Sequence, residues 1–186
     1  LCRSSGPVST RSAAPANVVL LLDNSSSMVL NSTGGRTRLA VMQEAASQLL
    51  RQHRDLRFGL FAFNPASGTG AQRDTAGGRL LVPVDGIGDD TAGRQHLQRL
   101  EQAITSLNPA AGSNPDLYTW TPLAETHYEI SRYLRGMSSF YEPSTPRYQS
   151  PLQWRCQANA AVVLTDGLPT HDSDFPASSQ QEPAGQ

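Results

Sequence analysis

The chain has 186 residues and a formal net charge of −1, and this length suits one domain with a sizeable core. The near-neutral charge indicates neither nucleic acid nor an anionic membrane surface as a partner. No apolar run approaches the ~20 residues that a membrane-spanning helix needs, so we expect no membrane span. Residues 1–5 form no signal peptide and the first residue is not Met, as in a mature or excised fragment, which is compatible with export.

Residues 1–16 are rich in Ser, Pro and Ala and predict an arm or linker, because they offer few apolar groups for packing. The two cysteines of the chain are Cys2 and Cys156. They are compatible with a single disulfide in an oxidising compartment, but also with two unrelated thiols. A bridge would tie the arm beside the last predicted strand.

Residues 17–22 predict the first strand, because an uninterrupted apolar run of this length is typical of a strand buried on both faces in a parallel sheet. The run ends in an Asp-x-Ser-x-Ser loop formed by Asp23, Ser25 and Ser27. Ligands bind just past the carboxyl ends of such strands. One carboxylate and two hydroxyls suit Mg²⁺, Mn²⁺ or Ca²⁺. Taken alone, the serines are equally compatible with a turn that caps the next helix.

The middle of the chain predicts two helices and two strands. Apolar residues at helical spacing indicate helices over residues 37–53 and 92–107. Strands are predicted over residues 57–63 and 79–84, and Pro83 places the second at a sheet edge, where its missing N–H does no harm. The expected apolar faces are Leu39, Met42, Ala46, Leu49 and Leu50 in the first helix, and Leu97, Leu100, Ile104 and Leu107 in the second.

Further oxygen-bearing side chains follow in the last third of the chain. A helix is predicted over residues 122–134, and Thr121 before it is an N-cap, a metal ligand or both. An inserted loop, residues 136–154, is of a length that is usually functional or mobile. It leads to a strand over residues 158–165, which we expect to be a second buried strand, ending at Asp166.

The end of the chain is polar. Asp172 and Asp174 lie in a turn, as a second cation site or as merely solvated acids. Residues 176–186, rich in Ser, Gln and Pro, predict a disordered tail.

The Asp-x-Ser-x-Ser loop, the threonine and the last acidic loop together resemble the metal-ion-dependent adhesion site of the von Willebrand factor A domain. Carried over residue by residue, the resemblance makes the metal-site residues Asp23, Ser25, Ser27, Thr121 and Asp166. It implies an α/β fold over residues 17–175, with a Rossmann-like, mostly parallel sheet flanked by helices, and truncated at the C-terminus. It implies a divalent cation, Mg²⁺ in the first place and Mn²⁺ or Ca²⁺ otherwise. The cation would bind an acidic residue of a protein ligand.

Several phrases are similar to the N-terminal module of PilY-type adhesins at the tip of type IV pili. They are Thr-Pro-Leu-Ala-Glu-Thr from residue 121, Arg-Tyr-Leu-Arg-Gly from residue 132, Arg-Cys-Gln-Ala-Asn from residue 155 and Leu-Thr-Asp-Gly-Leu-Pro-Thr from residue 164. The resemblance implies an exported protein at the cell surface, on the pilus tip or associated with the outer membrane. It also implies pilus subunits and a host or surface receptor as partners, and roles in pilus biogenesis, surface attachment and twitching motility.

Two residues depart from the family pattern. Trp120 stands where the family usually has Gly, which makes Thr119 a fallback ligand, and Ser26 also takes the place of a Gly. One alternative is a fold that keeps the loop without the metal. Another is an intracellular A-domain subunit of an ATPase-coupled chelatase or assembly complex. A hydrolase lacks support because no His lies in a motif that would serve as base and Gly-x-Ser-x-Gly is absent, so we expect no enzyme.

Overall fold

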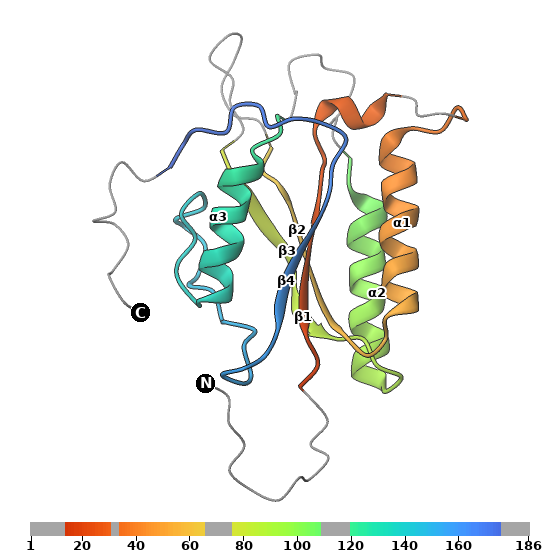
Figure 1. The fold of residues 1–186 in the computed structure, drawn as a ribbon, viewed down its shortest axis with the longest axis vertical. Coiled ribbons are helices and arrows are strands. Elements are labelled where there is room, and N and C mark those ends of the chain that lie inside the picture. Colours follow the sequence, from red (N-terminus) through yellow and green to blue (C-terminus); the bar gives the residue numbers. More distant parts are fainter. Residues whose placement is uncertain (1–13, 31–33, 66–75, 109–119, 176–186) are drawn as a thin grey trace, which may run out of the picture.

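The structure is a computed structural model that describes residues 14–30, 34–65, 76–108 and 120–175. It is an α/β fold with a four-stranded mixed sheet in the order β3-β2-β1-β4, flanked by helices (Figure 1). The strands are β1 (Asn17–Leu22), β2 (Arg57–Phe63), β3 (Gly78–Gly86) and β4 (Asn159–Leu164). The helices are α1 (Arg38–Gln52), α2 (Thr91–Ser106), α3 (Leu123–Leu134) and a short 3-10 helix, η1 (Ser26–Val29). Each predicted helix and strand is confirmed, with ends displaced by at most two residues.

The strand β1 lies at the centre of the fold and is buried along its whole length. It runs parallel to β2 on one side and to β4 on the other. Val18, Leu20 and Leu22 pack in one core with α1 and α2. Val19 and Leu21 pack in a second core with α3, on the other face of the sheet (Figure 1). An apolar run without alternation therefore fills two cores at once, as predicted.

The strand β3 is an edge strand and runs antiparallel to β2. Pro83 lies within it, so the expectation of an edge position is confirmed. An edge strand accommodates this residue because the missing N–H is not needed for pairing on its outer side.

The strand β4 differs from the expectation of a buried strand. Its first three residues are exposed and its last three are half-buried. In the described part of the chain it pairs only with β1, at the other edge of the sheet. The apolar composition of 160–164 correctly indicated a strand, but composition does not determine how many neighbours cover it.

The inserted loop, residues 136–154, contains no helix or strand and folds against α3. Glu129 of α3 is fully buried and fixes the loop in two places. The backbone N–H of Phe140 donates to one of its carboxylate oxygens at 3.0 Å, and the hydroxyl of Tyr148 donates to the other at 2.8 Å. Because both donors are in the loop, a loop without secondary structure of its own still has a fixed position.

None of the described helices is long and apolar enough to cross a membrane. The arm expected over residues 1–16 is described only from residue 14, and the tail expected over residues 176–186 lies outside the described residues.

Candidate metal site

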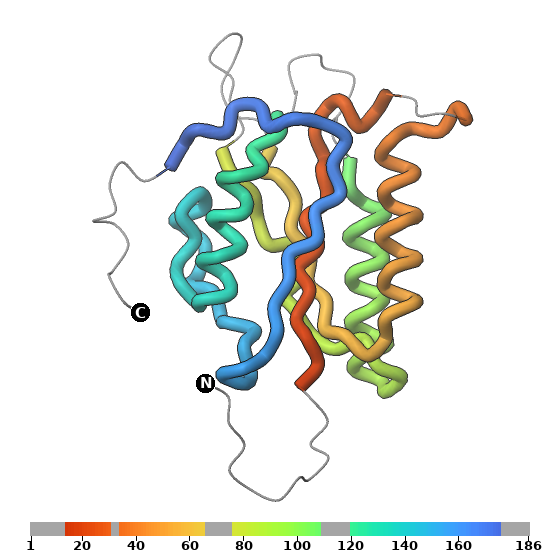
Figure 2. Tube along the Cα trace, viewed as in Figure 1, coloured from red at the N-terminus to blue at the C-terminus, as the bar shows by residue number. Residues whose placement is uncertain are grey.

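The loops that follow β1 and β4 meet the start of α3 at one end of the sheet. The path of the chain shows the segment after β4 crossing above the first turn of α3 (Figure 2). A cavity of about 350 Å³ lies there, and we call it the site cavity. Its lining includes four of the five predicted metal-site residues, Ser25, Ser27, Thr121 and Asp166. Residues from three distant parts of the sequence thus line one cavity.

Asp23, the fifth predicted residue, does not line this cavity and is fully buried. The backbone N–H of Ser25 donates to its Oδ1 at 2.7 Å, and the hydroxyl of Thr165 donates to its Oδ2 at 2.6 Å. Asp23 therefore ties the loop after β1 to the loop after β4. Thr165 was not predicted as a site residue, and its place directly before Asp166 was the available signal.

The serine hydroxyls form a short chain that ends on the second carboxylate. The Oγ atoms of Ser25 and Ser27 are 3.0 Å apart, and Ser27 donates to Oδ1 of Asp166 at 2.8 Å. The side chain of Asp166 is only 10% exposed. Two hydroxyls and one carboxylate of the cavity lining are therefore joined in one chain of hydrogen bonds, with Ser27 in the middle.

Arg38 is a site residue that the sequence analysis missed. Its guanidinium forms a salt bridge with Oδ2 of Asp166, and it also lines the site cavity. It is the first residue of α1, with Thr37 as the N-cap. The helix dipole disfavours a cation at that end, so an arginine there was a signal that an acidic partner lies nearby.

Thr121 is held through its backbone rather than by a helix cap. Its N–H donates to the hydroxyl of Thr170 at 3.1 Å, and its carbonyl accepts from the N–H of Thr170 at 3.1 Å. Pro122 occupies the N-cap position of α3, so the alternative that made Thr121 the N-cap is wrong. The fallback ligand Thr119 lies outside the described residues.

Trp120, the departure from the family pattern, stacks on His171 with ring centroids 4.2 Å apart and planes inclined by 21°. His171 has a positive φ of 50°, a conformation that few non-glycine residues adopt. Trp120 directly precedes Thr121 and His171 directly follows Thr170, so their stacking extends the Thr121–Thr170 contact by one residue on each chain segment. The bulky side chain of Trp120 is therefore accommodated by packing against the loop after β4.

Asp172 has a role that neither expectation for it included. Its two carboxylate oxygens accept from the backbone N–H groups of Ala124 at 2.7 Å and Glu125 at 2.8 Å. These are free donors in the first turn of α3, and a carboxylate there is favoured by the helix dipole. Asp172 is therefore a long-range N-terminal cap of α3 and not a merely solvated acid.

Glu125 lies directly below that cap and is fully buried. Its carboxylate accepts from the backbone N–H of Gly77 at 2.6 Å and of Asp174 at 2.7 Å. Burial raises the pKa of the Glu125 carboxyl, and the two backbone donors oppose that rise. Glu125 thus fastens the loop after β4 and the start of β3 to α3, and it does not face the site cavity.

The donor set of the site cavity fits a hard divalent cation. Its lining includes the hydroxyl-bearing residues Ser25, Ser27 and Thr121 and the carboxylate of Asp166, and such oxygens are the ligands that Mg²⁺ and Ca²⁺ prefer. Arg38 already pairs with Asp166, so a divalent cation that uses this carboxylate would have to displace a positive charge. Groups of three or more His, Cys, Asp or Glu side chains that could hold a metal are absent from the described residues. A site here therefore depends on hydroxyls as well as the carboxylate of Asp166, while that of Asp23 is not part of the cavity lining.

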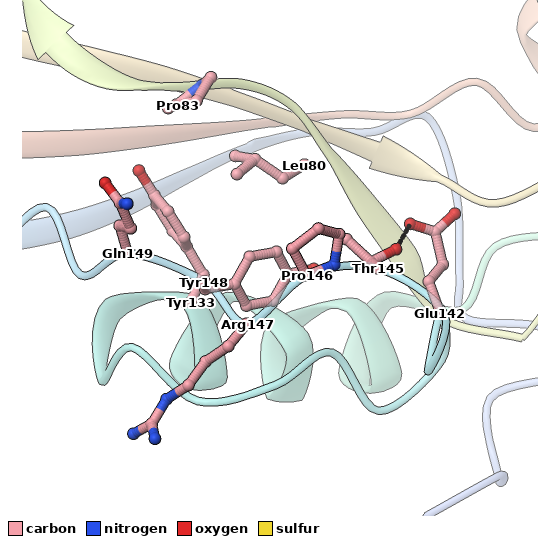
Figure 3. A pocket seen from close by; sticks show the side chains of 9 residues that line it. All are labelled: Leu80, Pro83, Tyr133, Glu142, Thr145, Pro146, Arg147, Tyr148 and Gln149. Carbon is pink, nitrogen blue, oxygen red and sulfur yellow. Dashed lines mark hydrogen bonds between the residues drawn. The ribbon is translucent and has the colours of Figure 1, made fainter.

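A second cavity, of about 310 Å³, lies between β3 and the inserted loop (Figure 3). Leu80, Pro83, Tyr133, Pro146 and Tyr148 give it an apolar lining, while the Arg147 side chain extends away from Leu80 and Pro83 (Figure 3). Burial raises the pKa of Tyr148, whose hydroxyl is held by Glu129. Nothing in the sequence analysis predicted this cavity, because it depends on how the inserted loop folds back.

Cys156 is disulfide-bonded, and the described residues contain no free cysteine. Its expected partner, Cys2, lies outside the described residues.

Comparison of the chain with protein-family models gives no match, and comparison with curated proteins gives none either.

Proposed function

We propose that this chain is a metal-dependent adhesion or interaction module with the von Willebrand factor A fold. The observation that carries the proposal is the convergence of Ser25, Ser27, Thr121 and Asp166 on one cavity. A Mg²⁺ ion held there by oxygens of the chain would supply an open coordination position. An acidic side chain of a protein ligand is the group that such a position attracts.

Binding rather than catalysis is favoured by the partners of the serines. Ser25 and Ser27 contact each other and Asp166. Among the described residues, those that line the site cavity include no histidine, so a serine nucleophile has no imidazole base among them.

We further propose that the module belongs to an exported, type IV pilus tip-associated protein of the PilY type, acting in pilus biogenesis, surface attachment and twitching motility. The sequence phrases around Thr121 and Asp166 support this placement. The disulfide at Cys156 also supports it, because disulfides persist in oxidising compartments and are rare in cytosolic proteins. The same observation disfavours the alternative of an intracellular chelatase or assembly subunit.

The experiment is calorimetric titration of the chain with Mg²⁺, Mn²⁺ and Ca²⁺. The variants are Asp23→Asn and Ser27→Ala, with Ser106→Ala, at an exposed position at the end of α2, as the matched control, and each fold is checked by circular dichroism. We expect saturable binding by the wild type and the control, and a loss of at least about tenfold in the two site variants, by analogy with supporting groups of other metal sites. A folded wild type that binds none of the three cations would refute the proposed metal site.

The acidic ligand and the pilus have their own test. A Glu-containing peptide should bind in Mg²⁺ and be released by chelator. Antibody against the chain should detect it in the sheared pilus fraction of cells that encode it. Detection in the cytosol alone, with Cys156 reduced, would contradict the exported placement.

A further inference from the structure

Arg38 lines the site cavity, where a metal cation is proposed to bind. It also lies at the N-terminus of α1, where the helix dipole disfavours a positive charge. It begins α1 without any acidic residue in the first turn, so its charge opposes the helix dipole. The structure offsets that cost through Asp166, which lies 128 residues further along the chain.

Both oxygens of Asp166 are engaged. Oδ1 accepts from the hydroxyl of Ser27, and Oδ2 pairs with the guanidinium of Arg38. A divalent cation that uses this carboxylate, directly or through water, must therefore compete with a positive charge already in place. The competition is local, because Arg38 lines the same cavity as the hydroxyls.

We propose that Arg38 is a built-in competitor for the cation and sets the affinity and selectivity of the site. This inference rests on the proposed metal-binding function. While no metal is bound, the guanidinium neutralises Asp166. A divalent cation displaces it, and a monovalent cation, with half the charge, does not.

The surroundings of Arg38 allow this exchange. Its side chain is 39% exposed, whereas that of Asp166 is 10% exposed. Arg38 also lines a neighbouring apolar groove together with Val41, Met42 and Leu164. The aliphatic part of the side chain can stay on that groove while the guanidinium moves into water, as arginine side chains commonly do.

The test is calorimetric titration with Mg²⁺ and with Mn²⁺ of the wild type, Arg38→Gln and Arg38→Lys. Arg51→Gln is the matched control, because it removes the same charge from the same helix at a pair with Glu101. We expect Arg38→Gln to bind at least about tenfold more tightly, within the usual range of coupling between two ligands. Arg38→Lys, which keeps the charge, and Arg51→Gln should stay close to the wild type.

Thermal unfolding gives a second readout. Without metal, Arg38→Gln should melt below the wild type, because the poorly exposed Asp166 loses its partner. Saturating Mg²⁺ should raise the Tm of Arg38→Gln more than that of the wild type, since tighter binding to the folded state stabilises it more. If Arg38→Gln does not fold, Arg38→Met, which keeps the aliphatic part on the groove, replaces it in both measurements.

The outcomes separate the two proposals. Tighter binding in Arg38→Gln supports the inference, including the case in which only the variant binds measurably. Equal or weaker binding in Arg38→Gln, with a wild type that binds, overturns the inference and leaves the metal site intact. No binding by any folded variant overturns the metal site and the inference with it.

Discussion

The cap that Asp172 places on α3 leads to a sharp prediction. Asp172→Ala removes two hydrogen bonds, of 2.7 and 2.8 Å, to the first-turn N–H groups of Ala124 and Glu125. It also removes a negative charge from the positive end of the helix dipole. Loss of a cap costs about 1 kcal/mol and loss of the dipole interaction about 0.3–1 kcal/mol, so we expect the free energy of unfolding to fall by about 1–2 kcal/mol.

The assay is urea and thermal unfolding, with Asp55→Ala as the control. Asp55 is an exposed acid between α1 and β2, and its removal changes the net charge equally. For a domain of this size, about 1 kcal/mol corresponds to roughly 2–4 °C in Tm. Asp172→Asn, which keeps one acceptor oxygen, should lie between Asp172→Ala and the wild type.

Amide hydrogen exchange locates the effect. In Asp172→Ala, the N–H groups of Ala124 and Glu125 should exchange faster, while those of α1 should not. If Asp172→Ala is as stable as Asp55→Ala and exchange in α3 is unchanged, the cap does not form and Asp172 is merely solvated.

Three further predictions concern the core and its titration. Burial lowers the pKa of His96 below its ordinary value of 6.5, so the unfolded chain takes up that proton first. The free energy of unfolding should fall as the pH drops from 6.5 towards the pKa of His96 in the folded state, by up to about 1.4 kcal/mol per pH unit. Urea unfolding at several pH values should show that this pH dependence is lost in His96→Gln and retained in His53→Gln. In Gly78→Ala the new methyl group would lie 2.4 Å from Cγ2 of Thr126 and 2.7 Å from the carbonyl oxygen of Ala62, which should lower the free energy of unfolding by about 1–3 kcal/mol. Gly86→Ala is the control, because its methyl group would have no heavy atom within 4 Å. Equal urea midpoints for the two variants would refute the close packing at Gly78. Tyr148→Phe removes the donor from the fully buried Glu129 and should cost about 1–3 kcal/mol in the same assay, whereas Tyr141→Phe, whose hydroxyl donates to an exposed carbonyl, should cost less.

The sequence was most informative where the determining interactions are local. Helical spacing, apolar runs and Pro83 specify α1, α2 and the edge position of β3, because each depends on neighbours in the chain. The meeting of the loops that hold Asp23 and Asp166 was within reach for a related reason, since the carboxyl ends of the parallel strands β1 and β4 lie at one edge of the sheet. Thr121 follows no predicted strand and was included through the family resemblance.

The features that were missed depend on partners far apart in sequence. Arg38 pairs with Asp166, which is 128 residues away in sequence, and Asp172 accepts a hydrogen bond from Ala124, which is 48 residues away. Neither pair has a spacing that periodicity can detect. The exposure of β4 was mispredicted for a similar reason, since an apolar run reports that a strand is suited to burial and not which elements cover it.

The position of β4 also affects how molecules of this chain meet one another. Asn159–Leu164 carries no charged residue, and charges and prolines are the usual protection of an edge strand against addition of another strand. In the described part of the chain the backbone groups on its outer side have no neighbouring strand, and its side chains are exposed or half-buried. Two copies at high concentration therefore present each other with a matching template for strand addition. Strand addition of this kind would be favoured by concentration, so dilute, freshly prepared samples are the appropriate material for the binding measurements above.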